Sequence, residues 1–242
     1  MFKLQCLLLC VCYLATVSIA GLVPFIDKCK WDDKACLLAS SQKAVPYVAA
    51  GLSDLGMPPL DPVHLSKVVY NEGGLAITFE DMTLTGPAQC KIKKVERNIA
   101  NDMLFLEAEC PIEVRGTYTA SGKILVLPIE GHGPFTVKTN NLLISLKVAL
   151  KYVDGQDGVK HWQVGKPDYS FDFKEKASLI FENLFNGDKE KSDAIHAIFE
   201  ENWKDLVMTI GKGIMNNAID TVVSTIGDFA TKVPTSELEL PY

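Results

Sequence analysis

The stretch LFLEAECPIEVR, residues 104–115, has an apolar side chain at every second position, and the positions between them are charged except for Phe105 and Pro111. Such alternation places the apolar members on one face of a β-strand and the others on the opposite face. Strands of this kind are typical of an antiparallel sheet that is covered on one side. The apolar positions of this strand are Leu104, Leu106, Ala108, Cys110, Ile112 and Val114.

The same period of two recurs on both sides of this stretch, at residues 75–80, 142–152 and 169–174. We therefore expect an antiparallel sheet from about residue 65 to about residue 174. Glycine-containing segments should mark the hairpin turns between its strands. These segments are Ser121-Gly122, Gly131-His132-Gly133-Pro134 and Asp154-Gly155-Gln156-Asp157-Gly158.

Helical periodicity flanks the predicted sheet. Apolar residues at a spacing near 3.6 predict a helix over about residues 32–55, and Pro46 inside it predicts a kink or two short helices. The apolar residues of segment 177–185 predict a short amphipathic helix that ends at Asn186-Gly187.

The last predicted helix begins with Ser192 as its N-cap and runs to about Lys232. Its length, ~60 Å at ~1.5 Å per residue, predicts an elongated α+β molecule in which the helix lies along a curved sheet. Gly211 and Gly213 lie inside this helix, where glycine costs about 1 kcal/mol relative to alanine. They either permit a close approach of the sheet or weaken the helix near a cavity.

Four cysteines follow residue 20, namely Cys29, Cys36, Cys90 and Cys110. In an oxidising compartment an even number predicts disulfides, and Cys29–Cys36 is the first choice because the two are close in sequence. Cys90 and Cys110 are equidistant from Ala100 in a predicted hairpin, which favours a second bridge, with two unpaired buried thiols as the alternative. No CxxC or CxxH spacing occurs, so no metal site is expected.

The first 20 residues have the pattern of a secretory signal peptide. Lys3 precedes an apolar run from Leu4 to about Leu14, and Ser18-Ile19-Ala20 suits signal peptidase. The run is short for a membrane anchor, which needs about 20 apolar residues. We therefore expect cleavage after residue 20, a single secreted, extracellular domain over residues 21–242, and no stable insertion into a membrane.

Composition and motifs narrow the function further. The chain has 242 residues, of which 48% are hydrophobic and 22% charged, and its formal net charge is −6. This composition excludes a disordered chain, and the acidic charge argues against a nucleic-acid partner, which requires a basic surface. The sequence contains no Gly-x-Ser-x-Gly, P-loop or dinucleotide-binding glycine pattern, so we expect neither catalysis nor a cofactor.

A curved sheet around one long helix leaves apolar space where the two diverge, and such space holds an apolar ligand more easily than water. The alternative is that the same side chains simply fill a core. Residues expected near the space are Phe79, Trp162, Phe171, Phe173, Trp203 and Ile210.

Several motifs, in this order and spacing, resemble the insect takeout / juvenile hormone-binding protein family over essentially the whole mature chain. They are the Cys29-to-Cys36 pair, Pro59-Leu60-Asp61-Pro62, SGKILVLPIEGHGPF at residues 121–135, Glu201-Asn202-Trp203-Lys204 and Lys232-Val233-Pro234. The chain has no cysteine after Cys110, which places it closer to the takeout branch. The Cys90 and Cys110 pair is not a general family feature.

The resemblance implies a tubular lipid-binding (TULIP-like) fold, in which a strongly curved antiparallel sheet wraps a long C-terminal helix around an internal hydrophobic tunnel. It also implies a monomeric, non-enzymatic haemolymph carrier of juvenile hormone, another terpenoid or a fatty-acid-like molecule, with relatives linked to circadian and feeding behaviour. The Cys29–Cys36 disulfide would lie beside the tunnel mouth, near Tyr47 and Val48.

The expected tunnel lining combines this resemblance with the apolar faces of the strands and helices. It consists of Tyr47, Val48, Leu52, Ile77, Phe79, Leu127, Leu142, Leu146, Trp162, Phe171, Phe173, Trp203, Ile210 and Ile214. Recognition of a hormone epoxide or ester requires a hydroxyl donor, for which Tyr47, Tyr118 and Tyr152 are the candidates.

Two other functions remain open at this point. A secreted signalling or interaction protein would keep the fold but fill the tunnel, with Trp162 and Trp203 as plugs, and would act through a receptor that the sequence does not identify. An ester hydrolase would need an activated nucleophile at Ser40, Ser41 or Ser224, beside which no base is apparent.

Overall fold

The computed structural model describes residues 21–124 and 126–241, and the predicted signal peptide lies outside this part of the chain. Within it, nine strands form one antiparallel sheet, with β5 and β6 at its centre. The strands are β1 (Val63–Leu65), β2 (Val68–Glu72), β3 (Leu75–Thr85), β4 (Lys91–Asn98), β5 (Met103–Ile124), β6 (Leu127–Asp154), β7 (Lys160–Val164), β8 (Asp168–Phe173) and β9 (Ser178–Phe181). The predicted α+β class is confirmed.

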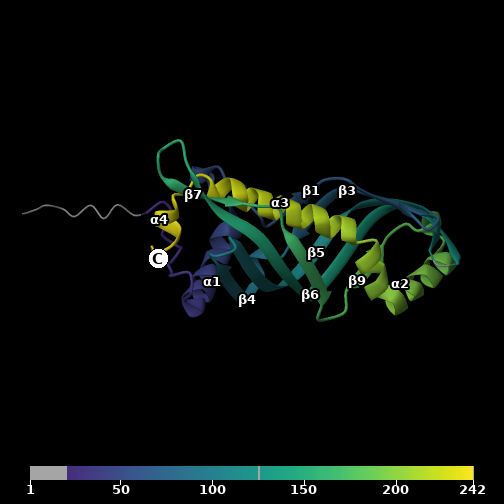
Figure 1. Cartoon of the computed structure of the whole chain (residues 1–242). Coiled ribbons are helices and arrows are strands. Elements are labelled where there is room, and N and C mark those ends of the chain that lie inside the picture. Colours follow the sequence, from purple (N-terminus) through teal and green to yellow (C-terminus); the bar gives the residue numbers. More distant parts are fainter. Residues whose placement is uncertain (1–20, 125, 242) are drawn as a thin grey trace, which may run out of the picture.

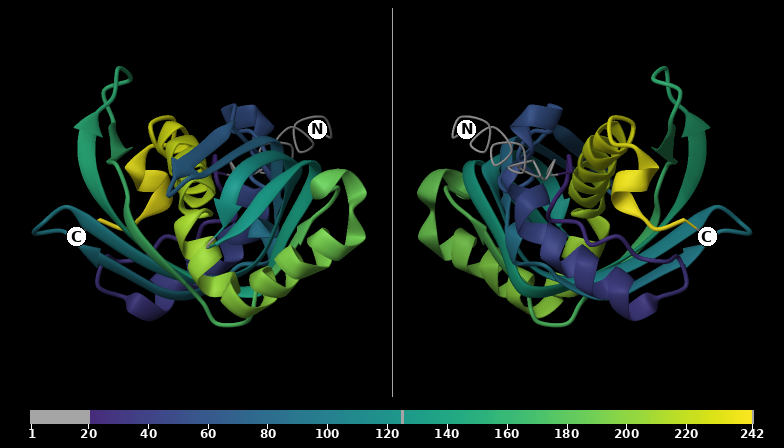
Figure 2. Two further views of the ribbon diagram at one scale, coloured as in Figure 1. Left: turned by 90° about the vertical axis from the view of Figure 1, so that its right-hand side faces the viewer. Right: turned by 90° about the vertical axis from the view of Figure 1, so that its left-hand side faces the viewer.

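The helices lie along and at the ends of this sheet. They are α1 (Lys34–Ala50), α2 (Lys189–Thr209), α3 (Lys212–Ala230) and the short α4 (Thr235–Leu238), with 3₁₀ turns η1 (Ser53–Leu55), η2 (Pro87–Gln89) and η3 (Phe185–Gly187). The molecule is elongated, with α1 near one end, α2 at the other and α3 along the length of the sheet (Figure 1). Seen down the long axis, the sheet is an open curve and α3 lies in its opening (Figure 2).

The central hairpin is longer than the sequence predicted. Strands β5 and β6 pair from Met103↔Ala149 to Ile124↔Leu127, so the chain reverses after Ile124 and neither Ser121-Gly122 nor Gly131–Pro134 forms a turn. Gly131 lies inside β6 for a different reason. A Cβ there would stand 3.0 Å from the Cα of Leu184, so glycine allows the segment after β9 to cross the strand closely. The third predicted turn, after Asp154, is confirmed.

The single long C-terminal helix was a wrong prediction. Helix α2 is capped by the Asp188 carboxylate rather than by Ser192, and it ends at Thr209, whereas α3 begins at Lys212. Asn202 also leaves helical geometry inside α2. Gly211 lies between the two helices with right-handed helical φ and ψ, and a Cβ there would stand 2.5 Å from the Val207 carbonyl oxygen.

Gly213 serves the first of the two roles considered for it, a close approach of the sheet. A Cβ at this residue would stand only 2.7 Å from a methyl group of Val68 on β2. The absence of a side chain therefore allows α3 to approach the sheet closely.

Segment 177–185 was also predicted wrongly, as a helix. Ser178–Phe181 forms β9, in which Leu179 pairs with Val137 and Phe181 pairs with Phe135 of β6. In so short a segment the apolar residues fit both the helical period of about 3.6 and the strand period of two. Pairing with the long strand β6 makes the segment a strand. At the other end, α1 confirms the first predicted helix, but it is one helix that contains Pro46 rather than two short ones.

Both predicted disulfides are present. Cys29 and Cys36 have Cα atoms 5.7 Å apart, and Cys90 and Cys110 have Cα atoms 4.2 Å apart. The second bridge follows the predicted hairpin register, because Lys91 pairs with Glu109 immediately beside it. Unpaired thiols at these two positions are therefore excluded in this structure.

A cluster of aromatic rings forms the centre of the core. Phe135 is 1% exposed, and its ring centroid lies 4.9 Å from Phe79 and 5.8 Å from Phe181. Tyr118 meets Phe181 edge-on at 4.9 Å and donates a hydrogen bond of 2.7 Å to the Glu182 carbonyl oxygen. The cluster fixes β3, β5, β6 and β9 to one another beneath α2.

Burial raises the pKa of Tyr118 to about 12. The unfolded chain releases this proton near pH 10, so the folded state holds more protons between about pH 10 and about pH 12. The contribution of Tyr118 to stability is complete below pH 10 and is lost as the pH rises through that window. We predict that Tyr118→Phe has a lower free energy of unfolding than wild type at pH 8. The difference between the two free energies, measured by urea denaturation, should be smaller at pH 11. A difference that grows with pH would contradict this assignment.

Candidate ligand-binding site

An apolar cavity of about 80 Å³ lies between the sheet and the helices α2 and α3. Strands β3, β5, β6, β8 and β9 form its floor, and the α2–α3 junction forms its roof. The lining consists of Ile77, Phe79, Ile112, Val114, Ile124, Val137, Thr139, Leu142, Phe173, Leu179, Phe181, Phe199, Leu206, Val207, Ile210, Gly211, Ile214 and Met215. We refer to it as the central cavity.

Six of the residues expected from the sequence lie in this lining. They are Ile77, Phe79, Leu142, Phe173, Ile210 and Ile214. The strand members face inward because their apolar positions alternate with outward polar ones, as the sequence indicated. Ile210 and Ile214 are four residues apart and span the junction of the two helices, so both face the cavity.

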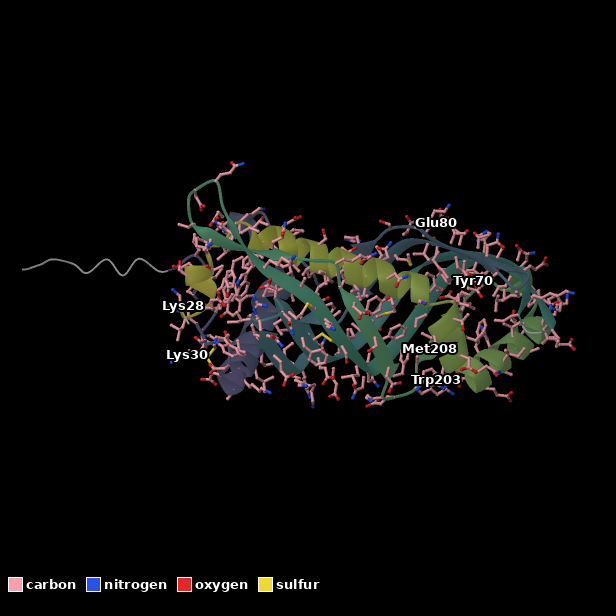
Figure 3. All side chains as sticks on the ribbon, in the orientation of Figure 1. Lys28, Lys30, Tyr70, Glu80, Trp203 and Met208 are labelled. Carbon is pink, nitrogen blue, oxygen red and sulfur yellow. A yellow bond between two sulfur atoms is a disulfide. The ribbon has the colours of Figure 1, made fainter. Side chains whose placement is uncertain are left out.

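The other expected residues lie outside the central cavity. Val48, Leu52 and Leu127 are half-buried against the main core, whereas Leu146, Phe171 and Trp203 pack around the second core cluster. Tyr47 is 48% exposed and stacks on Phe25, with ring centroids 4.6 Å apart. Trp203, on α2, lies in the other half of the molecule from Lys28 and Lys30 (Figure 3).

Sequence reasoning missed most of the roof and part of the floor. Leu179 and Phe181 were assigned to a helix, which concealed their inward alternation on β9. Phe199, Leu206 and Val207 lie on α2, whose bend away from α3 was not predicted. The periodicity of α2 could have indicated them, because Leu206 and Val207 follow Phe199 by seven and eight residues, which is the spacing of one helix face.

The chemistry of the central cavity is almost entirely apolar. Thr139, 4% exposed, supplies the single polar side chain among the lining residues that the structure describes. Its Oγ1 accepts a hydrogen bond of 3.4 Å from the Asn141 amide. Cavities with so few polar partners do not retain water well, and they favour hydrocarbon groups.

The three tyrosines considered as hydroxyl donors do not line this cavity. The Tyr118 hydroxyl donates to Glu182, and the Tyr152 hydroxyl donates to the Glu239 carboxylate at 2.6 Å. Tyr47 lies in the exposed stack with Phe25. Thr139 is therefore the candidate donor toward a ligand here.

Binding a terpenoid or an acyl chain requires this cavity to widen. Pockets for drug-sized ligands usually measure about 300–1,000 Å³, several times the volume present here. The roof is the part best placed to move, because the chain bends there at Gly211 and Asn202 already departs from helical geometry. Side-chain rotation of Met215 would add further space, since methionine is unbranched.

A second cavity of about 170 Å³ lies at the α1 end of the molecule, beside the Cys29–Cys36 disulfide. It has no lining residue in common with the central cavity over residues 21–124 and 126–241. Where the resemblance implied one hydrophobic tunnel, the described residues line these two hollows, which share no lining residue. Trp162, an expected tunnel residue, lines the second one, together with Arg97 of β4.

Other kinds of site receive no support from the described residues. No helix in that part of the chain is long and apolar enough to cross a membrane. No group of three or more His, Cys, Asp or Glu side chains gathers there in a way that could hold a metal ion. Ser40, one of the nucleophiles considered, is buried, and its hydroxyl donates to the Asp27 carbonyl oxygen at 2.8 Å.

Comparisons with known proteins match this architecture. A family model described as "Haemolymph juvenile hormone binding protein (JHBP)" matches residues 6–239. The circadian clock-controlled protein daywake of Drosophila melanogaster is 27% identical over 198 residues, which are 76% of this chain and 75% of that protein. A putative beta-carotene-binding protein of Schistocerca gregaria is 27% identical over 113 residues, which are 46% of this chain and 45% of that protein.

A solved structure shows the same fold. The crystal structure of Epiphyas postvittana Takeout 1 superposes with a TM-score of 0.86 at 32% sequence identity. The match covers 89% of this chain and all of that one, 100%. The curled antiparallel sheet and the C-terminal helices are therefore shared with that protein.

Proposed function

Because this chain belongs to the haemolymph juvenile hormone binding protein family, as its motifs predicted, we propose that it is a secreted carrier of a small hydrophobic molecule. The observation that supports this proposal most is the central cavity, which is lined by apolar side chains apart from Thr139. The predicted signal peptide over residues 1–20 supports release into an extracellular fluid such as haemolymph.

The proposed ligand class is a terpenoid or an acyl chain. The family description names juvenile hormone and the Schistocerca gregaria relative is named for beta-carotene, and both molecules are isoprenoid in skeleton. Apolar burial stabilises such a complex by about 25 cal/mol per Å². A ligand that buries about 400 Å² gains roughly 10 kcal/mol before ordering costs, which suffices for micromolar binding.

Native mass spectrometry of the secreted protein, purified without detergent, tests the carrier proposal. We expect a co-purified small molecule, or uptake of an added terpenoid or fatty acid. Failure to retain any member of either class, by a protein that is folded by circular dichroism, would contradict it.

A second candidate function rests on the small volume of the central cavity. At about 80 Å³ the cavity is nearly filled by its own side chains, as in a signalling or interaction protein that keeps the fold without a ligand. Trp203 contributes to this packing, since it meets Phe173 edge-on at 5.5 Å. The native mass spectrometry experiment described above also distinguishes the two functions, because only a carrier takes up added ligand.

Thr139 should distinguish oxygenated ligands from hydrocarbons. Its hydroxyl hydrogen is available to a ligand ester, ether or epoxide oxygen, because the hydroxyl oxygen is the acceptor in its hydrogen bond with the Asn141 backbone amide. Thr139→Val removes this donor while keeping the shape of the side chain. We predict that affinity for an oxygenated terpenoid falls by about 3- to 10-fold, the effect of one neutral hydrogen bond.

Calorimetric titration measures this difference, and a terpenoid hydrocarbon should bind Thr139→Val and wild type equally. Thr136→Val on the same strand is the matched control, because Thr136 lies outside the cavity lining. If Thr139→Val lost equal affinity for the oxygenated terpenoid and for the hydrocarbon, the substitution would be disturbing the packing of the cavity rather than removing a hydrogen bond to the ligand.

A further inference from the structure

The second cavity is built from parts of the chain that are distant in sequence. The N-terminal segment and α1 form one wall, β4, β5, β6 and β7 form the opposite wall, and residues 238–239 complete it. Trp31 belongs to the lining and is 39% exposed, which places the cavity beside solvent. A ligand can reach this hollow without passing through the central cavity.

Arg97 is the unusual residue of this cavity. Its side chain is only 7% exposed, and no carboxylate in the described chain forms an ion pair with it. Its Nη2 donates a hydrogen bond of 2.7 Å to the Leu150 carbonyl oxygen, whereas its Nε and Nη1 are buried without any partner. A buried guanidinium with unsatisfied donors is costly, and an acceptor would remove much of that cost.

A second unsatisfied donor lines the same cavity. The Trp162 indole Nε1 is buried and has no hydrogen-bond partner. Arg97 and Trp162 both line this cavity, and together they hold three buried N–H-bearing nitrogens without an acceptor in its wall. A fork of guanidinium N–H groups matches the two oxygens of a carboxylate, which accept in parallel.

The two acidic residues of the lining are engaged elsewhere. Asp27 pairs with Lys43 at 2.7 Å, and the Glu239 carboxylate accepts from the Tyr152 hydroxyl at 2.6 Å. The Arg97 guanidinium lies over the Tyr152 ring, 5.8 Å from the ring centroid. This cation–π contact stabilises the guanidinium but does not neutralise its charge. Neither carboxylate forms an ion pair with Arg97, so the Arg97 Nε and Nη1 groups have no anionic acceptor among the described residues.

We propose that the second cavity binds an amphipathic carboxylic acid, with its carboxylate on Arg97 and its tail against the apolar wall. That wall is formed by Ile26, Leu37, Ala44, Val95, Leu104 and Leu106. The volume of about 170 Å³ suits a short or medium acyl or terpenoid tail better than a long one. The proposal extends the carrier function above but uses separate residues, and it makes Arg97 the residue that distinguishes free acids from esters.

Calorimetric titration of the full secreted chain with decanoic acid and with methyl decanoate at pH 7.4 tests the proposal. The two ligands have the same tail, but only the acid carries a charge. We expect the acid to bind about tenfold more tightly or better, because hydrogen bonds to charged groups are the stronger ones. This comparison needs no substitution, so it does not depend on whether a variant folds.

Three variants locate the selectivity. Arg97→Met should bind acid and ester about equally, and Arg97→Lys should retain part of the preference because it keeps the charge without the fork. Arg115→Met is the matched control, because Arg115 is an exposed arginine on β5 that pairs with Glu113. We expect this control to keep the full preference for the acid.

Equal binding of acid and ester by wild type would overturn the proposal, and so would a preference that survives in Arg97→Met. A terpenoid hydrocarbon titrated in parallel separates this outcome from the carrier function. If the hydrocarbon binds and decanoic acid does not, the Arg97 site is refuted while the carrier stands. If the acid binds and the hydrocarbon does not, binding of apolar ligands in the central cavity is refuted instead, while the Arg97 site stands.

Discussion

A Val137→Trp variant should lose affinity for apolar ligands by about 100-fold or more while remaining folded. Val137 lies on β6 between its partners Val114 and Leu179, and it lines the central cavity. An indole at this position occupies space that the ligand needs. Denying the ligand about 110 Å² of apolar contact costs about 2.7 kcal/mol at about 25 cal/mol per Å², which corresponds to about 100-fold.

The matched control for this variant is Val69→Trp. Val69 lies on β2, is 61% exposed and does not belong to the lining. Overpacking by Val137→Trp should lower the free energy of unfolding by about 1–3 kcal/mol, which urea denaturation measures. Wild-type affinity in Val137→Trp, alongside a normal control, would show that ligands bind somewhere other than the central cavity.

Loss of the Cys90–Cys110 bridge should be the most destabilising change outside the core. The two cysteines are 20 residues apart, and closing a loop of that size stabilises the folded state by about 3 kcal/mol through the unfolded chain. The bridge also holds the hairpin that supports α1, because Gln42 donates to the Cys90 carbonyl oxygen and accepts from the Ile92 amide. We expect the double variant Cys90→Ala/Cys110→Ala to have a free energy of unfolding about 3 kcal/mol below that of wild type, as measured by urea denaturation.

The Cys29–Cys36 bridge provides the internal comparison for this prediction. It spans only 7 residues, so its removal should cost about 2 kcal/mol on the same entropy scale. A larger loss from Cys29→Ala/Cys36→Ala than from the Cys90/Cys110 pair would contradict the account.

The sheet could be predicted from the sequence because alternation is a local property. Residues 104–115 show the period of two in their own side chains, and the structure places them in β5. Segment 177–185 failed for the opposite reason. Its apolar residues satisfy both periods, and only pairing with β6, some 40 residues earlier, decides between them.

The break between α2 and α3 depends on tertiary contacts as well as on propensity. Gly211 and Gly213 were visible in the sequence, but their separate roles were not. Only the structure shows Gly211 between the helices and Gly213 against Val68. The role of Gly131 in β6 also depends on a tertiary contact. It does not form a turn, but it allows the segment after β9, which is distant in sequence, to pass close to the strand.

The candidate sites were predictable in part. The floor of the central cavity follows from strand alternation, whereas its roof requires the bend of α2. Arg97 carried a signal that was not used, because it lies two residues after Val95 and therefore on the same inward face of β4. An arginine at an inward strand position is an indication of a polar site inside an apolar interior.

The most direct test of the central claim is a measurement of where an apolar ligand lies. Isotope-filtered NMR of ¹³C-methyl-labelled protein, with an unlabelled terpenoid hydrocarbon, detects ligand protons close to individual methyl groups. The account predicts contacts to the methyls of Val137, Ile210 and Ile214, which enclose the central cavity from both the sheet and the helices. Contacts restricted to exposed methyls such as those of Val69, or to none, would contradict it.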